Sequence, residues 1–434
     1  MKLPATFLFV ATLTLPAVAD NWPQWRGPLL NGSTPEKGLV PAWSKTENIV
    51  WSTPLPGYSG STPVIWDDHV FVCSPDEQKN LLLFALDRRT GQVRWKQQVA
   101  ANANIEKGRN NSTSPSPVTD AQRVIALFAS GDLAAFDFAG KELWKRNLAN
   151  EHGKFQNMWI YGSSPLLHGG KLYIQVLQHH PPDYDHALDD KPSRESFLLC
   201  VDPATGKDHW RHIRPTEAVS EAMEAYTTPL PHQAKSGLQI IVVGGDYVTA
   251  HSPEDGREIW RCGGLNDRKE KYWRIVPSPV AWGNLVFASG PKRDPLLAIR
   301  DDGHGLVTDT HTAWKFQEFP TDCVTPLVYQ DKLFVLDGDR QMMTSLEPAT
   351  GKRLWQGNLG TREIFRASPT GADGRIYCIS ENGTAVVLEA GNEFKILSTF
   401  QMGEAPVRSS IAVAHGQLFV RTAKALYCVG GQKP

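Results

Sequence analysis

Residues 61–95, STPVIWDDHVFVCSPDEQKNLLLFALDRRTGQVRW, contain one complete structural unit of this chain. Pro63 can open a strand, because the first residue of a strand need not donate a ladder hydrogen bond. The apolar runs that follow predict an inner strand at 64–65, a second at 69–72, a third at 82–86 and an outer strand at 92–96. Gly91 supplies the positive φ of a bulged hairpin before the outer strand. The unit is therefore a four-stranded antiparallel sheet with Trp95 on its outer strand.

The same unit recurs along the chain. Its openings are Ser61-Thr62-Pro63, Ser116-Pro117, Ser164-Pro165, Thr228-Pro229, Ser278-Pro279, Thr325-Pro326, Ser368-Pro369 and a degenerate Ser409-Ser410-Ile411. The matching outer-strand residues are Trp95, Trp144, Trp210, Trp260, Trp314 and Trp355. Repeats of roughly 40 to 60 residues with several short strands are typical of propeller blades, because one sheet cannot bury both of its faces alone. The sequence predicts an all-β, eight-bladed β-propeller of four-stranded antiparallel blades.

The two ends of the chain complement each other. The last unit, residues 407–429, has inner strands but no outer strand with a Trp. Residues 47–55 have the outer-strand pattern, including Trp51, with no inner strands before them. We therefore predict that the N-terminal strand 47–55 completes the eighth blade and closes the ring, so that no sheet edge is left open. The loop-rich segment 21–43 is then expected to lie outside the ring and to pack over it.

The first residues are typical of an export signal. Met1-Lys2 is followed by an apolar run over 7–15 and by small residues at 17–19. This pattern predicts a signal peptide over residues 1–19 and a single propeller domain over 20–434. The run is too short to anchor the protein in a bilayer, no other stretch resembles a transmembrane segment, and no Cys stands at the cleavage point for a lipid anchor. We expect a periplasmic or secreted protein.

The charge balance bears on the class of partner. The chain has 45 Lys and Arg against 46 Asp and Glu, a net charge of -1, and no basic cluster. Nucleic acid is not an expected partner, because its phosphates demand a basic face. We expect a monomer.

Six cysteines in an exported chain raise the question of disulfides. Cys73 and Cys378 occupy equivalent second strands, and Cys200 and Cys428 equivalent third strands, which favours small buried hydrophobic side chains. Cys262 and Cys323 fall in predicted loops. They are the best candidates for a disulfide, provided that their Cα atoms approach within about 7 Å.

The residues just before each inner strand converge around the central tunnel at one face of a propeller. Here these positions are rich in aromatic, Arg and Asn residues, and the candidate ligand site consists of Tyr58, Asn110, Asn111, Trp159, Tyr161, Tyr226, Trp273, Arg274, Asp322, Arg366 and Arg408. Arg offers bidentate donors and aromatic faces offer stacking, which suits a planar or polyhydroxylated ligand with negative charge. The alternative is that these side chains pair with one another and plug the tunnel mouth.

An insertion at 178–190 in the third unit holds three His and four Asp. Candidate ligands for Zn²⁺ or a similar metal are His179, His180, Asp183, Asp185 and His186. Two prolines prevent a helix from bringing the histidines together, so a solvated acidic loop or part of a partner-binding rim is the alternative. No Ser/His/Asp or paired-carboxylate arrangement at a catalytic spacing is visible in the sequence.

The hairpin pattern Leu/Ala-x-Asp-x-x-Thr-Gly-x-x-x-Trp resembles the repeat of pyrroloquinoline-quinone (PQQ) propellers. It is carried by residues 83–95, 199–210 and 346–355, and the likeness covers nearly all of the mature chain. The stretches NWPQWRGP at 21–28 and GLVTDTHTAW at 305–314 look like those of an exported bacterial group of PQQ-like propellers. The chain is identified as a member of this family.

This resemblance implies several functions, because one fold hosts unrelated activities. The superfamily includes quinoprotein dehydrogenases, the propeller subunit of the outer-membrane β-barrel assembly machinery, and sensor modules of kinases. The dehydrogenases usually stack PQQ on a disulfide of adjacent cysteines and bind Ca²⁺ beside a catalytic Asp, and no two cysteines are adjacent here.

We therefore expect a non-catalytic module that binds a protein partner or a small ligand at the tunnel-mouth face. The alternative is a PQQ-dependent quinoprotein oxidoreductase, an alcohol or sugar dehydrogenase. In that case the arginines would hold the carboxylates of PQQ, with Ca²⁺ nearby, and Asp322 would act as the base.

Overall fold

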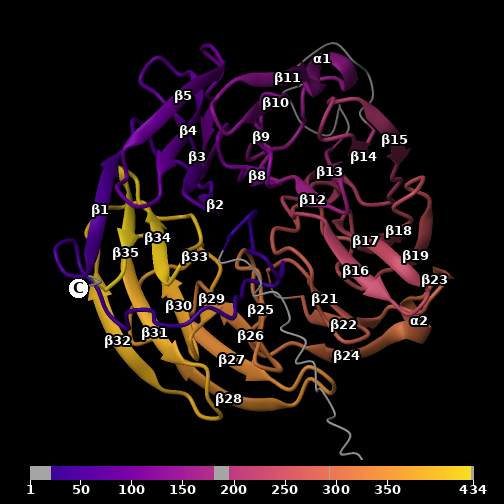
Figure 1. Ribbon diagram of the computed structural model, residues 1–434. Helices are drawn as coiled ribbons and strands as arrows, with labels where there is room; N and C mark the ends of the chain where they lie inside the picture. Colours follow the sequence, from indigo (N-terminus) through magenta and orange to yellow (C-terminus); the bar gives the residue numbers. More distant parts are fainter. Residues whose placement is uncertain (1–20, 180–194, 293, 432–434) are drawn as a thin grey trace, which may run out of the picture.

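The computed structural model describes residues 21–179, 195–292 and 294–431. Eight antiparallel sheets surround a central axis and confirm the predicted β-propeller (Figure 1). Blade 1 contains β2 (Val64–Trp66), β3 (His69–Pro75), β4 (Leu81–Asp87) and β5 (Val93–Ala100). Blade 2 contains β8 (Val118–Thr119), β9 (Arg123–Leu127), β10 (Asp132–Asp137) and β11 (Glu142–Asn147). Blade 3 contains β12 (Leu166–His168), β13 (Lys171–Val176), β14 (Phe197–Val201) and β15 (Asp208–Ile213).

The remaining blades follow the same order. Blade 4 contains β16 (Leu230–Ala234), β17 (Gly237–Gly244), β18 (Tyr247–His251) and β19 (Glu258–Cys262), extended by the parallel strand β23 (Gly305–Leu306). Blade 5 contains β20 (Val280–Trp282), β21 (Leu285–Ser289), β22 (Leu296–Arg300) and β24 (Thr312–Phe316). Blade 6 contains β25 (Leu327–Tyr329), β26 (Lys332–Asp337), β27 (Met342–Leu346) and β28 (Arg353–Asn358). Blade 7 contains β29 (Thr370–Ala372), β30 (Arg375–Ile379), β31 (Thr384–Glu389) and β32 (Ile396–Gln401).

Blade 8 joins the two ends of the chain, as predicted. It contains β33 (Ala412–Ala414), β34 (Gln417–Arg421), β35 (Ala425–Val429) and the N-terminal strand β1 (Ile49–Pro54). β1 lies beside β35 in antiparallel register, with Trp51 opposite Cys428 and Thr53 opposite Leu426 (Figure 1). The closure leaves no unpaired edge between the first and last blades.

Small elements connect the blades. They are a hairpin of β6 (Glu106–Lys107) and β7 (Asn110–Asn111), the helices α1 (Leu148–His152) and α2 (Thr308–His311), and a 3₁₀ turn at Ser220–Met223. Among the described residues, no helix combines the length and hydropathy that crossing a membrane requires. The predicted signal peptide, residues 1–19, lies outside the described residues.

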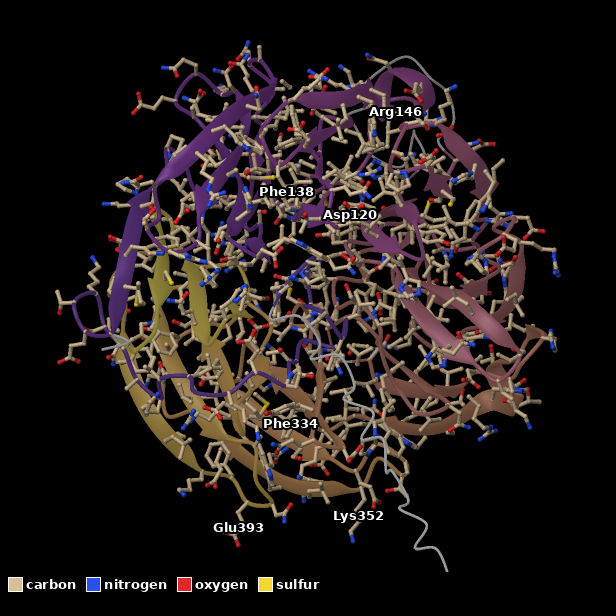
Figure 2. All side chains as sticks on the ribbon, viewed as in Figure 1. Asp120, Phe138, Arg146, Phe334, Lys352 and Glu393 are labelled. Carbon is tan, nitrogen blue, oxygen red and sulfur yellow. The ribbon has the colours of Figure 1, made fainter. Side chains whose placement is uncertain are left out.

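The outer-strand tryptophans join each blade to the next. The indole N–H of Trp95 donates to the Phe138 carbonyl in the following hairpin at 2.9 Å, and its ring lies 6.0 Å from that of Phe136. The indoles of Trp51, Trp144, Trp210, Trp314 and Trp355 make the equivalent bond to a carbonyl of the next blade. Figure 2 shows that Phe138 lies within the ring, whereas Lys352 and Glu393 project from its outer rim.

The hairpin glycines explain how these rings fit. Gly140 has a φ of 87°, and a Cβ there would lie 2.8 Å from the Trp95 ring. Any other residue at this position would therefore have a strained backbone, and its Cβ would displace the indole. The Gly of the repeated hairpin is thus required by the turn and by the Trp of the neighbouring blade.

The Ser and Thr residues at the strand openings form a closed ring of hydrogen bonds around the tunnel. Each backbone N–H donates to the hydroxyl of the corresponding residue in the next blade, with N–O distances from 2.8 to 3.2 Å. We call this set the hydroxyl ring; it consists of Thr62, Ser116, Ser164, Thr228, Ser278, Thr325, Ser368 and Ser410. The bond from Ser410 back to Thr62 closes it, so all eight blades are linked around the axis.

Replacing one hydroxyl of this ring by a methyl group should cost measurable stability. Thr325 is 1% exposed and its Oγ1 accepts the Ser278 N–H at 2.9 Å. Thr325→Val keeps the shape but leaves a buried N–H without its acceptor, so we expect a loss of about 1–3 kcal/mol in the free energy of unfolding. Denaturant unfolding measures it. Thr399→Val on the exposed face of β32 is the matched control, with an expected change within about 0.5 kcal/mol.

The N-terminal segment packs over the ring, as predicted, but it also reaches into the centre of the molecule. Trp22 is 1% exposed and pairs with Ile65 of β2. The Arg26 guanidinium is buried and donates to the carbonyls of Asn31, Pro326 and Pro369 at 2.8 to 3.0 Å. Burial lowers the pKa of Arg26 to about 9, which still leaves a cation at neutral pH.

The expectation for Cys262 and Cys323 was wrong. All six cysteines are free thiols. Cys262 ends β19 inside blade 4, with its Sγ 3.7 Å from the Thr312 hydroxyl, and Cys323 lies at the tunnel mouth next to Asp322. The two thiols therefore lie in different parts of the protein. Cys262 is not in a loop as predicted, because strand β19 extends to this residue.

Candidate functional site

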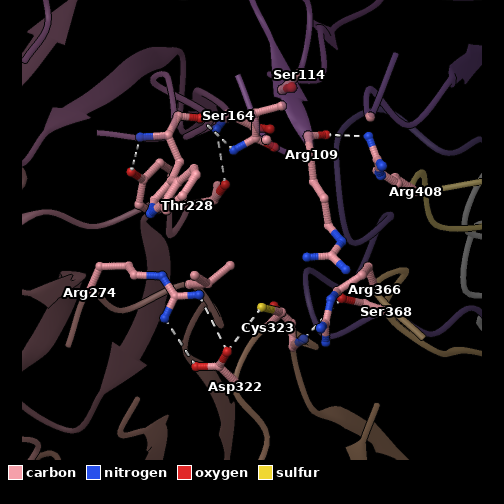
Figure 3. A pocket seen from close by; sticks show the side chains of 18 of the residues that line it. Arg109, Ser114, Ser164, Thr228, Arg274, Asp322, Cys323, Arg366, Ser368 and Arg408 are labelled. Carbon is pink, nitrogen blue, oxygen red and sulfur yellow. Dashed lines mark hydrogen bonds and ion pairs between the residues drawn. The ribbon is translucent and has the colours of Figure 1, made fainter. Parts of the chain in front are cut away.

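A pocket of about 500 Å³ lies at the face of the ring where the inner strands begin. Its wall is formed by residues that precede inner strands in several blades, and Trp25 of the N-terminal segment also lines it. Figure 3 shows Arg109, Arg274, Arg366 and Arg408 around this cavity. We call it the mouth pocket. Its size lies within the range of small-molecule sites.

Seven of the predicted site residues line the mouth pocket. They are Asn110, Trp159, Tyr226, Arg274, Asp322, Arg366 and Arg408. Each comes from a different connection between consecutive blades, and the circular arrangement brings these seven connections to one place. The structure thus gathers most of the predicted set around a cavity.

The other four predicted residues, which do not line the pocket, support its wall or pack elsewhere. The Tyr58 ring lies 5.2 Å from the Arg408 guanidinium, and Arg268 lies 4.4 Å from the Trp273 ring. The Asn111 amide, 0% exposed, donates to the Tyr58 carbonyl at 2.7 Å. Tyr161 turns into the protein and donates its hydroxyl to the Gln175 carbonyl at 2.7 Å, because its ring packs in the apolar cluster with Phe155.

Two arginines from opposite ends of the chain share one carboxylate at the pocket wall. The Nε atoms of Arg109 and Arg408 lie 3.0 and 2.9 Å from Glu381 Oε1. Arg408 also donates to the Arg109 carbonyl at 2.6 Å. The shared acceptor holds both guanidinium groups in place and leaves one of the two positive charges unmatched.

Arg274 occupies another part of the wall and is paired more completely. Its guanidinium lies 3.3 Å from Asp322 and 3.5 Å from Glu221. Burial opposes the charge on Arg274, but the two carboxylates outweigh it and raise the pKa. Burial also raises the pKa of Glu221, although the Trp159 indole donates to this carboxylate at 2.7 Å.

Arg366 and Cys323 lie beside this pair. Arg366 Nη2 donates to Asp339 at 2.6 Å, whereas its Nη1 is buried and finds no hydrogen-bond partner among residues 21–179, 195–292 and 294–431. The Cys323 thiol is near Asp322, and burial raises its pKa to about 12. The thiol is therefore protonated at neutral pH and is a poor nucleophile.

The hydroxyl ring contributes the inner lining. Six of its members border the pocket, namely Ser116, Ser164, Thr228, Thr325, Ser368 and Ser410. Each hydroxyl oxygen already accepts one backbone N–H, so its own O–H is free to donate toward a ligand or water. The Trp159 ring adds an apolar surface and rests against Gly108, where a Cβ would come within 2.8 Å.

The predicted metal cluster is described only at its first residue. His179 is 3% exposed, and its Nδ1 lies 2.6 Å from the buried Glu224 carboxylate. Glu224 in turn accepts the Tyr226 hydroxyl at 2.7 Å, so this pair braces the pocket wall. His180, Asp183, Asp185 and His186 lie outside the described residues. Across residues 21–179, 195–292 and 294–431, no three His, Cys, Asp or Glu side chains gather as a metal site.

The residues present fit PQQ only in part. Guanidinium groups suit the carboxylates of the quinone. However, the pocket carboxylates Asp322 and Glu221 both face Arg274, and all cysteines are free thiols, so neither the stacking disulfide nor an acidic set for Ca²⁺ is present among the described residues. The Asp322 carboxylate is engaged in the ion pair with Arg274.

Several lining residues were missed by the sequence analysis. Arg109, Glu221, Tyr272, Lys292 and Cys323 precede inner strands or extend from neighbouring loops. Arg109 is adjacent to the predicted Asn110, so a wider window around each opening would have included it. Trp25 carried no signal, because it belongs to no repeat. The repeated Ser/Thr-Pro motif contains most residues of the hydroxyl ring. The motif predicts where strands open, but it does not predict the hydrogen bonds between blades.

The chain was compared with known families and structures. The family model described as outer membrane protein assembly factor BamB matches residues 30–179 and 194–430. No curated protein gives a significant match.

Solved structures with this architecture come from enzymes and from an assembly factor. A quinohemoprotein alcohol dehydrogenase of Pseudomonas putida HK5 aligns with a TM-score of 0.67 at 13% identity, covering 96% of this chain and 81% of that one. BamB from Moraxella catarrhalis aligns at 0.61 and 14% identity, covering 88% and 99%. A europium-containing methanol dehydrogenase aligns at 0.67 and 11%, covering 93% and 90%. Such identities show the fold alone. Since the family model spans nearly all of the propeller, the chain belongs to the PQQ-like repeat family that includes BamB.

Proposed function

We propose that this propeller is a binding module that captures a small anionic ligand in the mouth pocket. The observation that supports it most is the charge of the pocket wall. Five cations line it, namely Arg109, Arg274, Lys292, Arg366 and Arg408, and they outnumber by one the lining carboxylates Glu221 and Asp322 together with the ion-pair partners Glu381 and Asp339. Such a surplus attracts anions, and its effect is strengthened by the low-dielectric walls of a concave site.

The arrangement suits binding more than chemistry. The candidate reactive groups of the wall are engaged or inert: the Asp322 carboxylate forms an ion pair with Arg274, and burial raises the pKa of the Cys323 thiol to about 12, which keeps it protonated. A general base or nucleophile needs a pKa near the working pH and a free reaction partner. We also propose that the module acts outside the cytoplasm as a monomer, in line with the export pattern of residues 1–19.

A second function, PQQ-dependent oxidation, is favoured by one observation, the match between guanidinium groups and the carboxylates of the quinone. The lack of a stacking disulfide and of an acidic Ca²⁺ set among the described residues weighs against it. It is therefore included as an arm of the experiment.

Calorimetric titration with citrate, phosphate, galacturonate and PQQ, the last with and without Ca²⁺, tests the proposal, with glucose as the neutral control. We expect at least one anion to bind and Arg366→Ala to weaken it about 10-fold or more, because a charge-assisted hydrogen bond is lost. The free energy of unfolding should fall by less than about 1 kcal/mol, since the partner Asp339 is 47% exposed.

Two results would contradict the proposal. One is that no anion binds. The other is that Arg366→Ala destabilises the fold strongly while leaving anion affinity unchanged, which would make the arginines a structural plug. Tight Ca²⁺-dependent PQQ binding with dye-linked oxidation of an alcohol or sugar would instead support the oxidoreductase.

A further inference from the structure

One side of the mouth pocket carries an unmatched positive charge. The guanidinium groups of Arg109, Arg366 and Arg408 are paired there with two carboxylates, Glu381 and Asp339. Arg109 and Arg408 use the same oxygen, Glu381 Oε1, so a single negative charge serves both. Three cations against two anions leave this side suited to one further negative group.

Two of these side chains, Arg109 and Arg366, also have unused donors. Within the described residues, the side-chain hydrogen bonds of Arg109 involve its Nε only, which leaves Nη1 and Nη2 available, and its side chain is 52% exposed. Arg366 Nη1 is buried and has no hydrogen-bond partner in the described part of the chain. A buried guanidinium N–H without an acceptor is costly, and a bound ligand or water is the usual explanation. A carboxylate can accept from several such donors at once.

The rest of the pocket lining combines polar groups with aromatic rings. The hydroxyl ring offers O–H groups that both donate and accept, Asn110 offers an amide, and Glu221 and Asp322 offer acceptors. Trp25, Trp159 and Tyr272 add aromatic surface at the floor and wall. A ligand that satisfies this lining needs many hydroxyl groups, which exchange both kinds of hydrogen bond, and C–H faces that pack on aromatic rings.

We infer that the mouth pocket takes an acidic saccharide, with a sugar carboxylate held by Arg109, Arg366 and Arg408 and the sugar hydroxyls bound by the hydroxyl ring. This inference rests on the proposed function and names its ligand class. Phosphate or citrate matches the charge and can accept from the hydroxyl ring, but it has no C–H face of sugar size to cover the aromatic surface. A neutral sugar matches the hydroxyl ring and the aromatic surface but leaves the unmatched charge uncompensated.

The test is calorimetric titration of the protein with digalacturonate and with cellobiose, a neutral disaccharide of similar size. We expect digalacturonate to bind at least about 10-fold more tightly, because a charge-assisted contact is added. Arg109→Gln should lower digalacturonate affinity about 10-fold and cellobiose affinity by a clearly smaller factor, because only digalacturonate loses a contact with a charged group. Arg257→Gln is the matched control: it makes the same change of charge in the exposed hairpin of blade 4, 73% exposed, and should alter neither affinity.

The outcomes separate this inference from the proposed function. Two results would overturn the assignment of the sugar carboxylate to the three arginines. One is equal affinity for the two disaccharides, and the other is an equal loss of affinity for both of them in Arg109→Gln. If citrate or PQQ binds in a manner sensitive to Arg366→Ala but neither disaccharide binds, the saccharide inference is wrong and the anion-binding function stands. If neither the anion panel nor digalacturonate binds, both are wrong.

Discussion

A chain that begins at residue 55, and so lacks β1 and the N-terminal segment, is expected not to reach a folded state. It loses Trp22, Trp43 and Trp51, which are 1%, 1% and 8% exposed in the intact protein. Removing a buried Trp side chain costs about 3–5 kcal/mol, and a whole domain is stable by only about 5–15 kcal/mol. The truncation also exposes the edge of β35, a site for aggregation. Soluble yield and thermal unfolding followed by circular dichroism measure the effect.

A chain that begins at Asn21 is the control for this truncation. It removes only residues 1–20, which are not among the described residues, and keeps every described contact of β1, so it should unfold cooperatively. Trp51→Ala in the longer chain isolates the closing strand, because the Trp51 indole donates to the Arg88 carbonyl of blade 1 at 2.7 Å. If the chain from residue 55 unfolds at the same temperature as the control, blade 8 is stable without its fourth strand and the closure has no energetic role.

Trp260→Ala should be the most destabilising of the single substitutions considered. Trp260 is 0% exposed and lies in the apolar cluster between blades 4 and 5 with Ile275 and Val286. Its indole donates to Gln239 Oε1 at 3.0 Å, within its own blade, so the substitution also strips a buried amide of its partner. We expect a loss of about 3–5 kcal/mol in the free energy of unfolding. Urea denaturation gives the value.

Trp159→Ala is the companion variant. Trp159 is 37% exposed at the mouth pocket, so the same truncation should cost at most about 1–2 kcal/mol. The difference between the two variants measures burial, since the chemical change is the same. Similar losses would mean that the Trp159 loop is a structural element of the core, and its role in the pocket would have to be reconsidered.

Much of the site could be anticipated from the openings of the repeats. Asn110, Trp159, Tyr226, Arg274, Asp322, Arg366 and Arg408 all precede inner strands and all line the pocket. Tyr161 occupies an equivalent position but faces the apolar cluster with Phe155, because Ile160, between Trp159 and Tyr161, has a φ of 69° and breaks the alternation of an extended segment. The direction of a side chain in a loop depends on its dihedral angles, which the repeat pattern does not specify.

The number of blades, their strand order and the closing strand follow from the sequence by itself. These features depend on local periodicity and on hairpin residues such as Gly91 and Gly140, whose conformations are set within a few residues. Only the tertiary structure decided which charges meet. Arg109 and Arg408 share Glu381 although they are 299 residues apart, and Trp25 enters the pocket from a segment outside every repeat. Such contacts arise when the ring closes, because closure alone brings the ends of the chain to the same axis.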